Sequence, residues 1–313
     1  MDLKAFLNIL TEIIYILCGL VSISVAIRGL KNEKARVGTF LFWFILGVIF
    51  ILGKTIPYAV TGGLLVILAL ITVTKQLQVG TFKEITHEFK VAQSEKFKNK
   101  IFLPAALIGI SAFLILQFKI GKVTIPSAVG IGGGALIALL VATAIIKPKF
   151  SETAEDTSRL LMQIGATALL PQLLAALGAV FTKPGVGKVI AQSISSVVPS
   201  GNIFIGIVIY AVGMALFTMI MGNAFAAFSV ITVGIGVPFI LKHGGNPAAI
   251  GALGMTAGYC GTLMTPMAAN FNIVPASILE IKNKNGIIKT QLPMALALFV
   301  VHIILMLLLF GIK

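Results

Sequence analysis

The sequence predicts an all-α, polytopic membrane protein, and three observations support this fold class. Apolar residues make up 58% of the 313 residues, charged residues make up only 11%, and the mean hydropathy is +1.06. Apolar segments of roughly 17 to 25 residues, the length that crosses a bilayer as a helix, recur along the chain. The alternation of apolar and polar residues that a transmembrane β-barrel requires is absent.

The 24 lysines and arginines give the chain a net charge of +14 and predict its orientation. They lie between apolar segments rather than on one soluble face, so the positive-inside rule explains them and nucleic-acid binding is not expected. We place the loops with four, six, three and three of these cations in the cytoplasm, with the N-terminus outside the cytoplasmic (inner) membrane of a bacterium. These loops are residues 28–36, 75–100, 147–159 and 282–289.

About seven apolar segments are predicted to cross the membrane as full helices. The first is too long for the apolar part of a signal peptide and lacks a cleavage site, so we expect it to be retained. The first three form an N-terminal segment, residues 1–74. The predicted spans are residues 6–27, 39–52, 57–73, 101–118, 127–146, 160–181 and 291–312.

Residues 75–100 form the longest polar stretch and separate the N-terminal segment from residues 101–313. Apolar residues recur there at roughly helical spacing, which predicts an amphipathic helix on the cytoplasmic membrane surface, with a solvated linker as the alternative. A similar stripe in residues 185–198 predicts an interfacial helix on the outer surface. The apolar positions of the first stripe are Phe82, Ile85, Phe89, Ala92 and Phe97.

Residues 203–241 are apolar except at Gly222 and Asn223, which are followed by Ala224. Each arm is about long enough to span, so length alone does not separate a re-entrant hairpin from two full crossings. A turn exposed to the cytoplasm would carry lysine or arginine, as the other cytoplasmic loops do. The charge-free turn therefore favours a re-entrant hairpin with a buried tip.

Residues 248–281 form a second unusual segment, an apolar run of 34 residues. As one helix it would reach about 50 Å, against a bilayer core of about 30 Å. Two glycines and Pro266 weaken the helix between residues 258 and 266, so we predict a broken helix. Asn270 and Asn272 follow the break, and either line a cavity or bond across helices.

The hairpin and the broken helix together resemble the ion transporter superfamily, secondary carriers that include dicarboxylate, citrate and gluconate permeases. In that superfamily, the hairpin tip and the helix break bind a coupling cation and the substrate carboxylate. The chain resembles one inverted-repeat half of such a carrier, which implies a second homologous subunit or a second copy of the chain. Its tip lacks the two hydroxyls of the Ser-Asn-Thr found in better-known members. The resemblance implies a site at Gly222, Asn223, Ala224, Gly261, Thr262, Thr265, Pro266 and Asn270.

Nearly the whole chain is similar to a family of bacterial membrane proteins of unknown function. Members of that family are typically found beside a second, smaller membrane protein and a pyroglutamyl peptidase. This second resemblance implies a two-subunit carrier for 5-oxoproline.

The chemistry of the two breaks suits a small carboxylate and a small hard cation. N–H groups at the start of the half-helices suit a carboxylate, and freed carbonyls near Asn223 and Thr265 suit Na⁺. Oxygen ligands argue against a transition metal, and no cofactor is expected. Only Glu12 and Glu280 bring an acid toward the membrane interior, which favours Na⁺ coupling, although Glu12 keeps proton coupling as an alternative.

Two other classes of function are weighed against a carrier. Cys18 and Cys260 both lie in apolar segments, so neither a disulfide framework nor a cysteine metal site is expected. An intramembrane enzyme normally presents a cluster of catalytic side chains, but the three histidines are isolated and the sequence has no His-Glu-x-x-His motif. We therefore do not expect an enzyme. A structural or regulatory membrane subunit is the other alternative.

Overall fold

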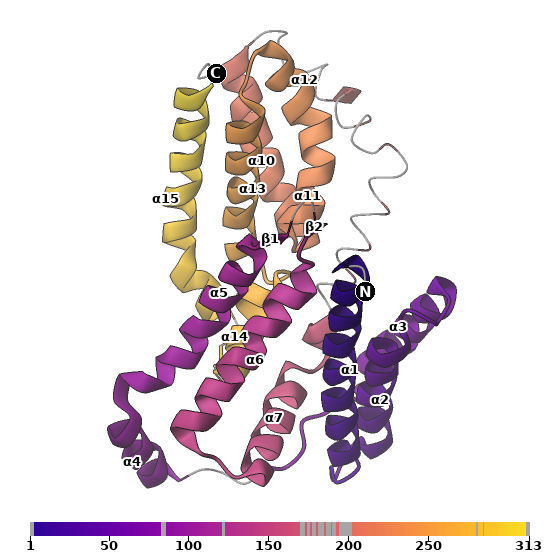
Figure 1. Cartoon of the computed structure of the whole chain (residues 1–313). Coiled ribbons are helices and arrows are strands. Elements are labelled where there is room, and N and C mark those ends of the chain that lie inside the picture. The colour runs from indigo at the N-terminus through magenta and orange to yellow at the C-terminus, as the bar shows by residue number, and fades with distance from the viewer. Residues whose placement is uncertain are drawn as a thin grey trace. The chain divides into compact units, whose positions relative to one another are not determined.

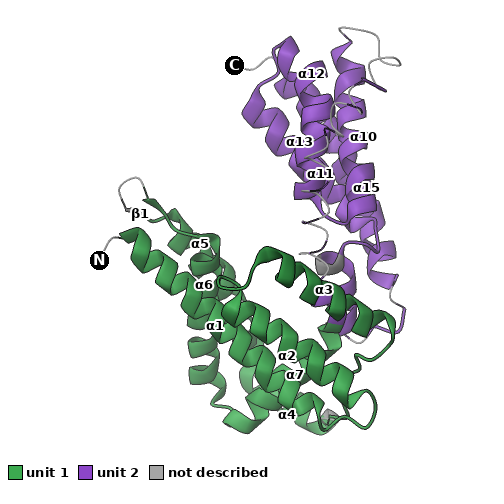
Figure 2. Cartoon of the chain, turned by 90° about the vertical axis from the view of Figure 1, so that its right-hand side faces the viewer, with its two compact units in different colours: residues 1–165 green, residues 166–313 purple. Residues whose placement is uncertain are grey.

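The computed structural model describes residues 3–82, 86–120, 123–169, 202–279, 281–283 and 285–310, with isolated positions between 173 and 193. The chain divides into two compact units, residues 1–165 and 166–313 (Figure 2). The predicted division at residues 74 and 100 stays a prediction. Six helices of the described residues are long and apolar enough to cross a membrane, so the chain is a multi-pass membrane protein, as the composition predicts.

The first two helices of unit 1, α1 (Leu3–Gly29) and α2 (Arg36–Leu52), form a tightly packed pair (Figure 1). An added Cβ on Gly19 would lie 2.8 Å from the Gly47 carbonyl oxygen, and one on Gly47 would lie 2.9 Å from the Gly19 carbonyl oxygen. The two backbones therefore approach as closely as small residues allow. Helix α3 (Tyr58–Val73) follows, with most of its side chains exposed.

The polar stretch between the predicted spans contains a shorter helix than expected, α4 (His87–Phe97). Its apolar side chains do not gather on one face, and none of the residues from Glu88 to Phe97 is buried. The structure thus differs from the predicted amphipathic pattern. A 3₁₀ turn, Lys98–Ile101, with Lys98 at φ +45°, joins it to α5 (Phe102–Gln117).

A two-stranded antiparallel hairpin, β1 (Lys119–Ile120) and β2 (Val123–Thr124), connects α5 to α6 (Ser127–Ile146). This matches the short turn expected between the two spans. Gly134 allows α5 and α6 to approach, because a Cβ there would lie 2.7 Å from the Ile108 carbonyl oxygen.

Helix α7 (Phe150–Ile164) begins inside the predicted loop and ends inside the predicted span 160–181. Gly165, at φ +52°, terminates it, and the 3₁₀ turn Gly165–Leu169 follows. A continuous span from residue 160 is therefore wrong, because a glycine in this conformation ends the helix. The rest of that span and most of the predicted interfacial helix 185–198 lie outside the described residues.

Unit 2 is built around four long helical segments that lie side by side (Figure 1). Buried apolar side chains from all four form its core, with Tyr210, Met214, Ile250 and Met306 at the centre. The elements are α10 (Ile203–Met221), α11 (Ala224–Ile231), a π-helical turn (Thr232–Gly236), α12 (Val237–Phe239), a 3₁₀ turn (Leu241–His243), α13 (Pro247–Leu263), a π-helical turn (Ala269–Ile273), α14 (Val274–Ile278) and α15 (Gly286–Leu309).

Candidate functional site

The turn between α10 and α11 is made by two residues whose conformations explain its tightness. Gly222 ends α10 in the left-handed region, at φ +67°, where a side chain would be strained. Asn223 caps α11, with its Oδ1 accepting hydrogen bonds from the N–H groups of Phe225 (2.9 Å) and Ala226 (3.3 Å). The cap therefore occupies two N–H groups of the kind predicted to hold a carboxylate.

The predicted break of the long apolar run lies at the end of α13, which stops at Leu263. The hydroxyl of Thr265 joins this break to the last turn of α10, since its Oγ1 donates to the carbonyl oxygen of Met219 at 2.8 Å. The same Oγ1 accepts a hydrogen bond from the N–H of Met267 at 3.2 Å. Thr262 bonds within its own helix, donating to the Tyr259 carbonyl oxygen at 2.6 Å.

Helices α10 and α13 run parallel, and their ends lie within about one turn of each other along the helix axis. An added Cβ on Gly254 would meet the ring of Tyr210, and one on Gly261 would lie 2.9 Å from the Cα of Ala215. The contacts advance along both helices in the same direction until Thr265 reaches Met219. Two helix C-termini, each with partial negative charge and carbonyl oxygens not used within a helix, therefore converge at the break.

Asn272, in the π-helical turn after the break, forms hydrogen bonds with two backbone carbonyl groups at the break. Its Nδ2 donates to the carbonyl oxygens of Thr262 (2.9 Å) and Thr265 (2.7 Å). The residue is 1% exposed. Its Nδ2 thus bonds to the end of α13 and to the residue just after it, and the alternative that Asn272 also lines a cavity stays a prediction. The side chain of Asn270, also predicted for the site, lies outside the description.

Two buried oxygens beside the break have no hydrogen-bond partner among the described residues. They are Thr218 Oγ1 in the last turn of α10 and Asn272 Oδ1. Thr218 is 0% exposed, and its hydroxyl would lie 3.1 Å from a Cβ on Gly258. An unpaired buried polar atom costs about 1 to 3 kcal/mol, so such an atom calls for an explanation, such as a bound ion or water.

Sequence reasoning missed Thr218 because nothing in its local sequence distinguishes it. A threonine inside a helix normally bonds to a carbonyl of the preceding turn and signals no site. The usable signal is the spacing of Gly254, Gly258 and Gly261, which predicts a face of α13 that another helix approaches closely. Which helix that is cannot be read from the spacing.

Aromatic side chains border the same region. Phe225 at the tip lies edge-on to Tyr259 of α13, with ring centroids 6.0 Å apart, and Tyr259 lies 6.1 Å from Phe271 after the break. These three rings connect the start of α11, the end of α13 and the segment that follows the break.

A polar contact also joins α10 to the other π-helical turn, where Tyr210 Oη lies 2.9 Å from Thr232 Oγ1. Such turns occur frequently at functional sites.

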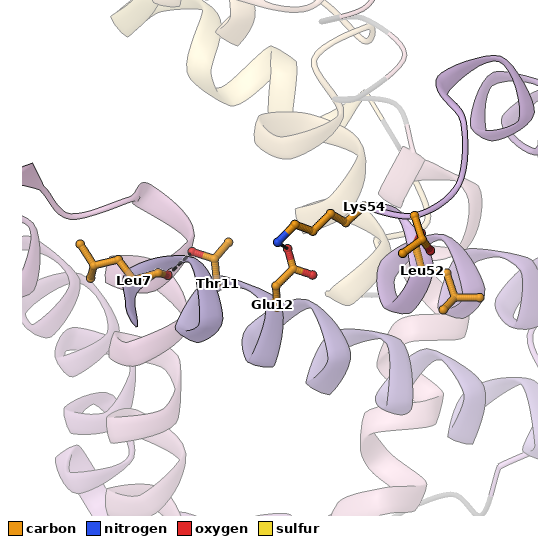
Figure 3. A network of polar contacts seen from close by, with 6 residues as sticks. Leu7, Thr11, Glu12, Leu52 and Lys54 are labelled. Carbon is orange, nitrogen blue, oxygen red and sulfur yellow. Dashed lines mark hydrogen bonds and ion pairs between the residues drawn. The ribbon is translucent and has the colours of Figure 1, made fainter. Parts of the chain in front are cut away.

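The acid singled out by sequence, Glu12, lies in unit 1 and is paired (Figure 3). Its carboxylate is 3.3 Å from the ammonium group of Lys54, and the two side chains are 34% and 65% exposed. Nearby, Thr11 Oγ1 donates to the Leu7 carbonyl oxygen at 2.9 Å. The charge of Glu12 is thus compensated within its own unit. Glu280 lies outside the described residues.

Contacts join the end of α10 and the start of α11 to the break: Thr265 bonds to the Met219 carbonyl oxygen, and a Cβ on Gly258 would lie 3.3 Å from the Cβ of Ala224. Thr218 and Asn272, which are not among the eight residues predicted for the site, also lie beside the break. The predicted binding role of the eight residues stays a prediction. In the part of the chain that the structure describes, no group of three or more His, Cys, Asp or Glu residues is placed to hold a metal ion. The oxygens at the break are all neutral hydroxyl, amide or carbonyl groups, which suit a hard monovalent cation.

Comparison with known families gives one match. Residues 12–310 match the family described as "Protein of unknown function (DUF979)". No curated protein and no solved structure matches the chain.

Proposed function

The chain belongs to the DUF979 family, and we propose that it is a subunit of a secondary active transporter that moves a small organic anion together with Na⁺. The observation that carries this proposal is a pair of buried oxygens, Thr218 Oγ1 and Asn272 Oδ1, that have no hydrogen-bond partner among the described residues and lie beside the break. Broken helices with polar groups facing the break are the usual ion sites of secondary carriers.

A Na⁺ ion would satisfy both oxygens. Na⁺ can be held by neutral oxygen ligands at short distance, so the site does not require a carboxylate. The C-terminal ends of α10 and α13 add partial negative charge, which attracts the cation. The carbonyl of Thr262 has a second lone pair beyond the one that Asn272 uses, so it also serves as a ligand. A proton is less suited to this place, because none of these groups titrates between about pH 5 and 8.

The anion is proposed to bind beside the cation, near the ring of Tyr259. Because Asn223 occupies the N–H groups of Phe225 and Ala226, the positive charge that the anion needs comes from Na⁺ rather than from the tip. This makes anion binding depend on the cation, which is the thermodynamic requirement for coupled transport. Thr265 transmits the coupling, since it bonds the break to α10.

The substrate and the partner are proposed from resemblance. The likeness to a family found beside a pyroglutamyl peptidase favours 5-oxoproline as the anion. The likeness to one half of a carrier favours assembly with a homologous subunit or a second copy, in the cytoplasmic membrane of a bacterium, with the N-terminus outside.

The test is uptake of radiolabelled 5-oxoproline into proteoliposomes that contain the chain purified with its copurifying membrane partner. We expect uptake driven by an inward Na⁺ gradient, and none with a choline gradient of equal size. Uptake driven by a pH gradient without Na⁺ would replace the proposal with proton coupling. A preparation that binds neither Na⁺ nor any small carboxylate would favour a structural or regulatory subunit.

A further inference from the structure

The polar residue Gln291 extends an apolar stripe of α15 whose members are buried or partly buried. This stripe has the three- to four-residue spacing of one helix face and packs against the core of unit 2. Gln291 lies one turn before the fully buried Ala295 and continues the stripe toward the start of the helix. The apolar members are Ala295, Phe299, Ile303, Met306 and Phe310.

The amide oxygen of Gln291 has no hydrogen-bond partner among the described residues, although it is buried. It shares this property with Thr218 Oγ1 and Asn272 Oδ1, which lie in the same unit. All three atoms can accept, and two of them are amide oxygens that cannot donate. The common need of the three is therefore a cation or a hydrogen-bond donor.

The register of α15 places Gln291 at the level of the break. The ring of Phe310, just after the end of α15, would lie 3.3 Å from a Cβ on Gly245, just before the start of α13, so the two helices run antiparallel from this point. The interval from Gly245 to Met264 along the chain has the same number of residues as the interval from Gln291 to Phe310. At about 1.5 Å per residue, this count puts Gln291 near the level of Met264, where α13 has just ended, with Pro293 interrupting α15 between Gln291 and Phe310.

We propose that Gln291 Oε1 is a ligand of the Na⁺ site, so that α15 completes a cation site begun by α10 and the broken helix. The inference rests on the proposed function. A set of two amide oxygens, one hydroxyl and backbone carbonyls carries no formal charge. Such a set binds a monovalent cation and discriminates against Ca²⁺ and Mg²⁺, whose sites normally include carboxylates.

The experiment measures ²²Na⁺ binding to the full-length protein in detergent, together with the rise in melting temperature that Na⁺ produces. For the wild type, we expect saturable binding with the same Kd at about pH 5 and about pH 8, because the ligands do not titrate. Gln291→Leu should raise the Kd roughly tenfold or more, since one ligand to a charged group is lost. The matched control is Gln117→Leu, the same change at an exposed position of α5, which should leave the Kd unchanged.

Gln291→Glu provides a readout that a purely structural role would not produce. The carboxylate should bind Na⁺ at least as well as the wild type at about pH 8 and weaken as the pH falls and the carboxyl group is protonated. If Gln291→Leu fails to fold, this pH dependence decides the matter. A wild-type Kd in both Gln291→Leu and Gln291→Glu, at both pH values, would overturn the role of Gln291 alone. A wild type that does not bind Na⁺ would overturn the proposed Na⁺ coupling and this inference with it.

Discussion

The α1–α2 pair of unit 1 and the α10–α13 pair of unit 2 both pack through glycines, but they differ in how their buried polar groups are satisfied. In unit 1, the buried Thr39 hydroxyl accepts from the Gln78 N–H at 3.2 Å, and Asn32 Nδ2 donates to the Gln78 carbonyl oxygen at 3.1 Å. In unit 2, Thr218 is as deeply buried as Thr39 and has no partner among the described residues.

The difference teaches that burial of a threonine does not by itself indicate a site. The polar groups of unit 1 hold the segment after α3 against the turn between α1 and α2, and this is a structural task. Trp43 Nε1 is the unpartnered buried atom of unit 1 among the described residues, and as an N–H donor it cannot bind a cation. Among the described residues of unit 2, the buried atoms without a hydrogen-bond partner are oxygens, which can bind a cation.

The largest expected effect comes from adding one methyl group to each close helix pair. Gly261→Ala places a Cβ against the backbone of Ala215, and Gly19→Ala places one against Ile51 and the Gly47 carbonyl. Each should lower the free energy of unfolding by about 1 to 3 kcal/mol through overpacking. Only Gly261→Ala should also weaken ²²Na⁺ binding, because it separates α10 from α13 at the break.

The control for this comparison is Gly62→Ala in α3, where an added Cβ meets nothing within 4 Å. It should stabilise the helix by about 0.5 to 1 kcal/mol, since alanine loses less backbone entropy than glycine. Melting curves in detergent give all three values. Unchanged Na⁺ binding by a folded Gly261→Ala protein would separate the cation from the α10–α13 contact.

The second effect has opposite signs in the two units. Thr218→Val removes an unpartnered hydroxyl, so stability without Na⁺ should rise by about 1 kcal/mol, while the Kd for Na⁺ rises roughly tenfold. Thr39→Val leaves the N–H of Gln78 without its partner, so stability should fall by about 1 to 2 kcal/mol with no change in Kd. A loss of stability in Na⁺-free Thr218→Val would show that this hydroxyl has a structural partner.

Sequence alone predicts the features that local composition determines. The glycine and asparagine at residues 222 and 223 predict a tight turn, and the length of the run 248–281 predicts that its helix breaks, and both features are present. The end of α7 at Gly165 was missed because an apolar run in the sequence predicts one continuous helix. The positive φ of Gly165, which ends the helix, is visible only in the backbone conformation.

The site was harder to predict because its geometry depends on which helices meet. The parallel approach of α10 and α13 brings Thr218 to Gly258. The proposed role of Gln291 depends likewise on the antiparallel packing of α15 against α13. Neither follows from spacing along one helix. Asn223 was predicted as a ligand from its position at the tip, while its Oδ1 serves as a helix cap, a task that only the backbone conformation reveals.

A smaller effect tests whether Asn223 acts only as this cap. Asn246 caps α13 in the same manner, accepting from Ala248 N (3.0 Å) and Ala249 N (3.2 Å), so it is a matched control. Asn223→Ala and Asn246→Ala should each lower stability by about 1 kcal/mol. Asn223→Ser keeps a capping oxygen, so its stability and its Kd for Na⁺ should both stay close to those of the wild type. A Kd raised about tenfold in Asn223→Ser would instead make Asn223 a ligand, as the tip position predicts.

The smallest expected effect concerns Glu12, whose ion pair with Lys54 is partly exposed. Pairs of this kind contribute within about 1 kcal/mol, so Glu12→Gln and Lys54→Met should each change the melting temperature only slightly. If Na⁺ drives transport through unit 2, uptake by Glu12→Gln should keep the wild-type rate and pH dependence. Loss of uptake in Glu12→Gln but not in Lys54→Met would identify the carboxylate itself as a proton carrier, because the two variants break the same ion pair and only one removes the titrating group.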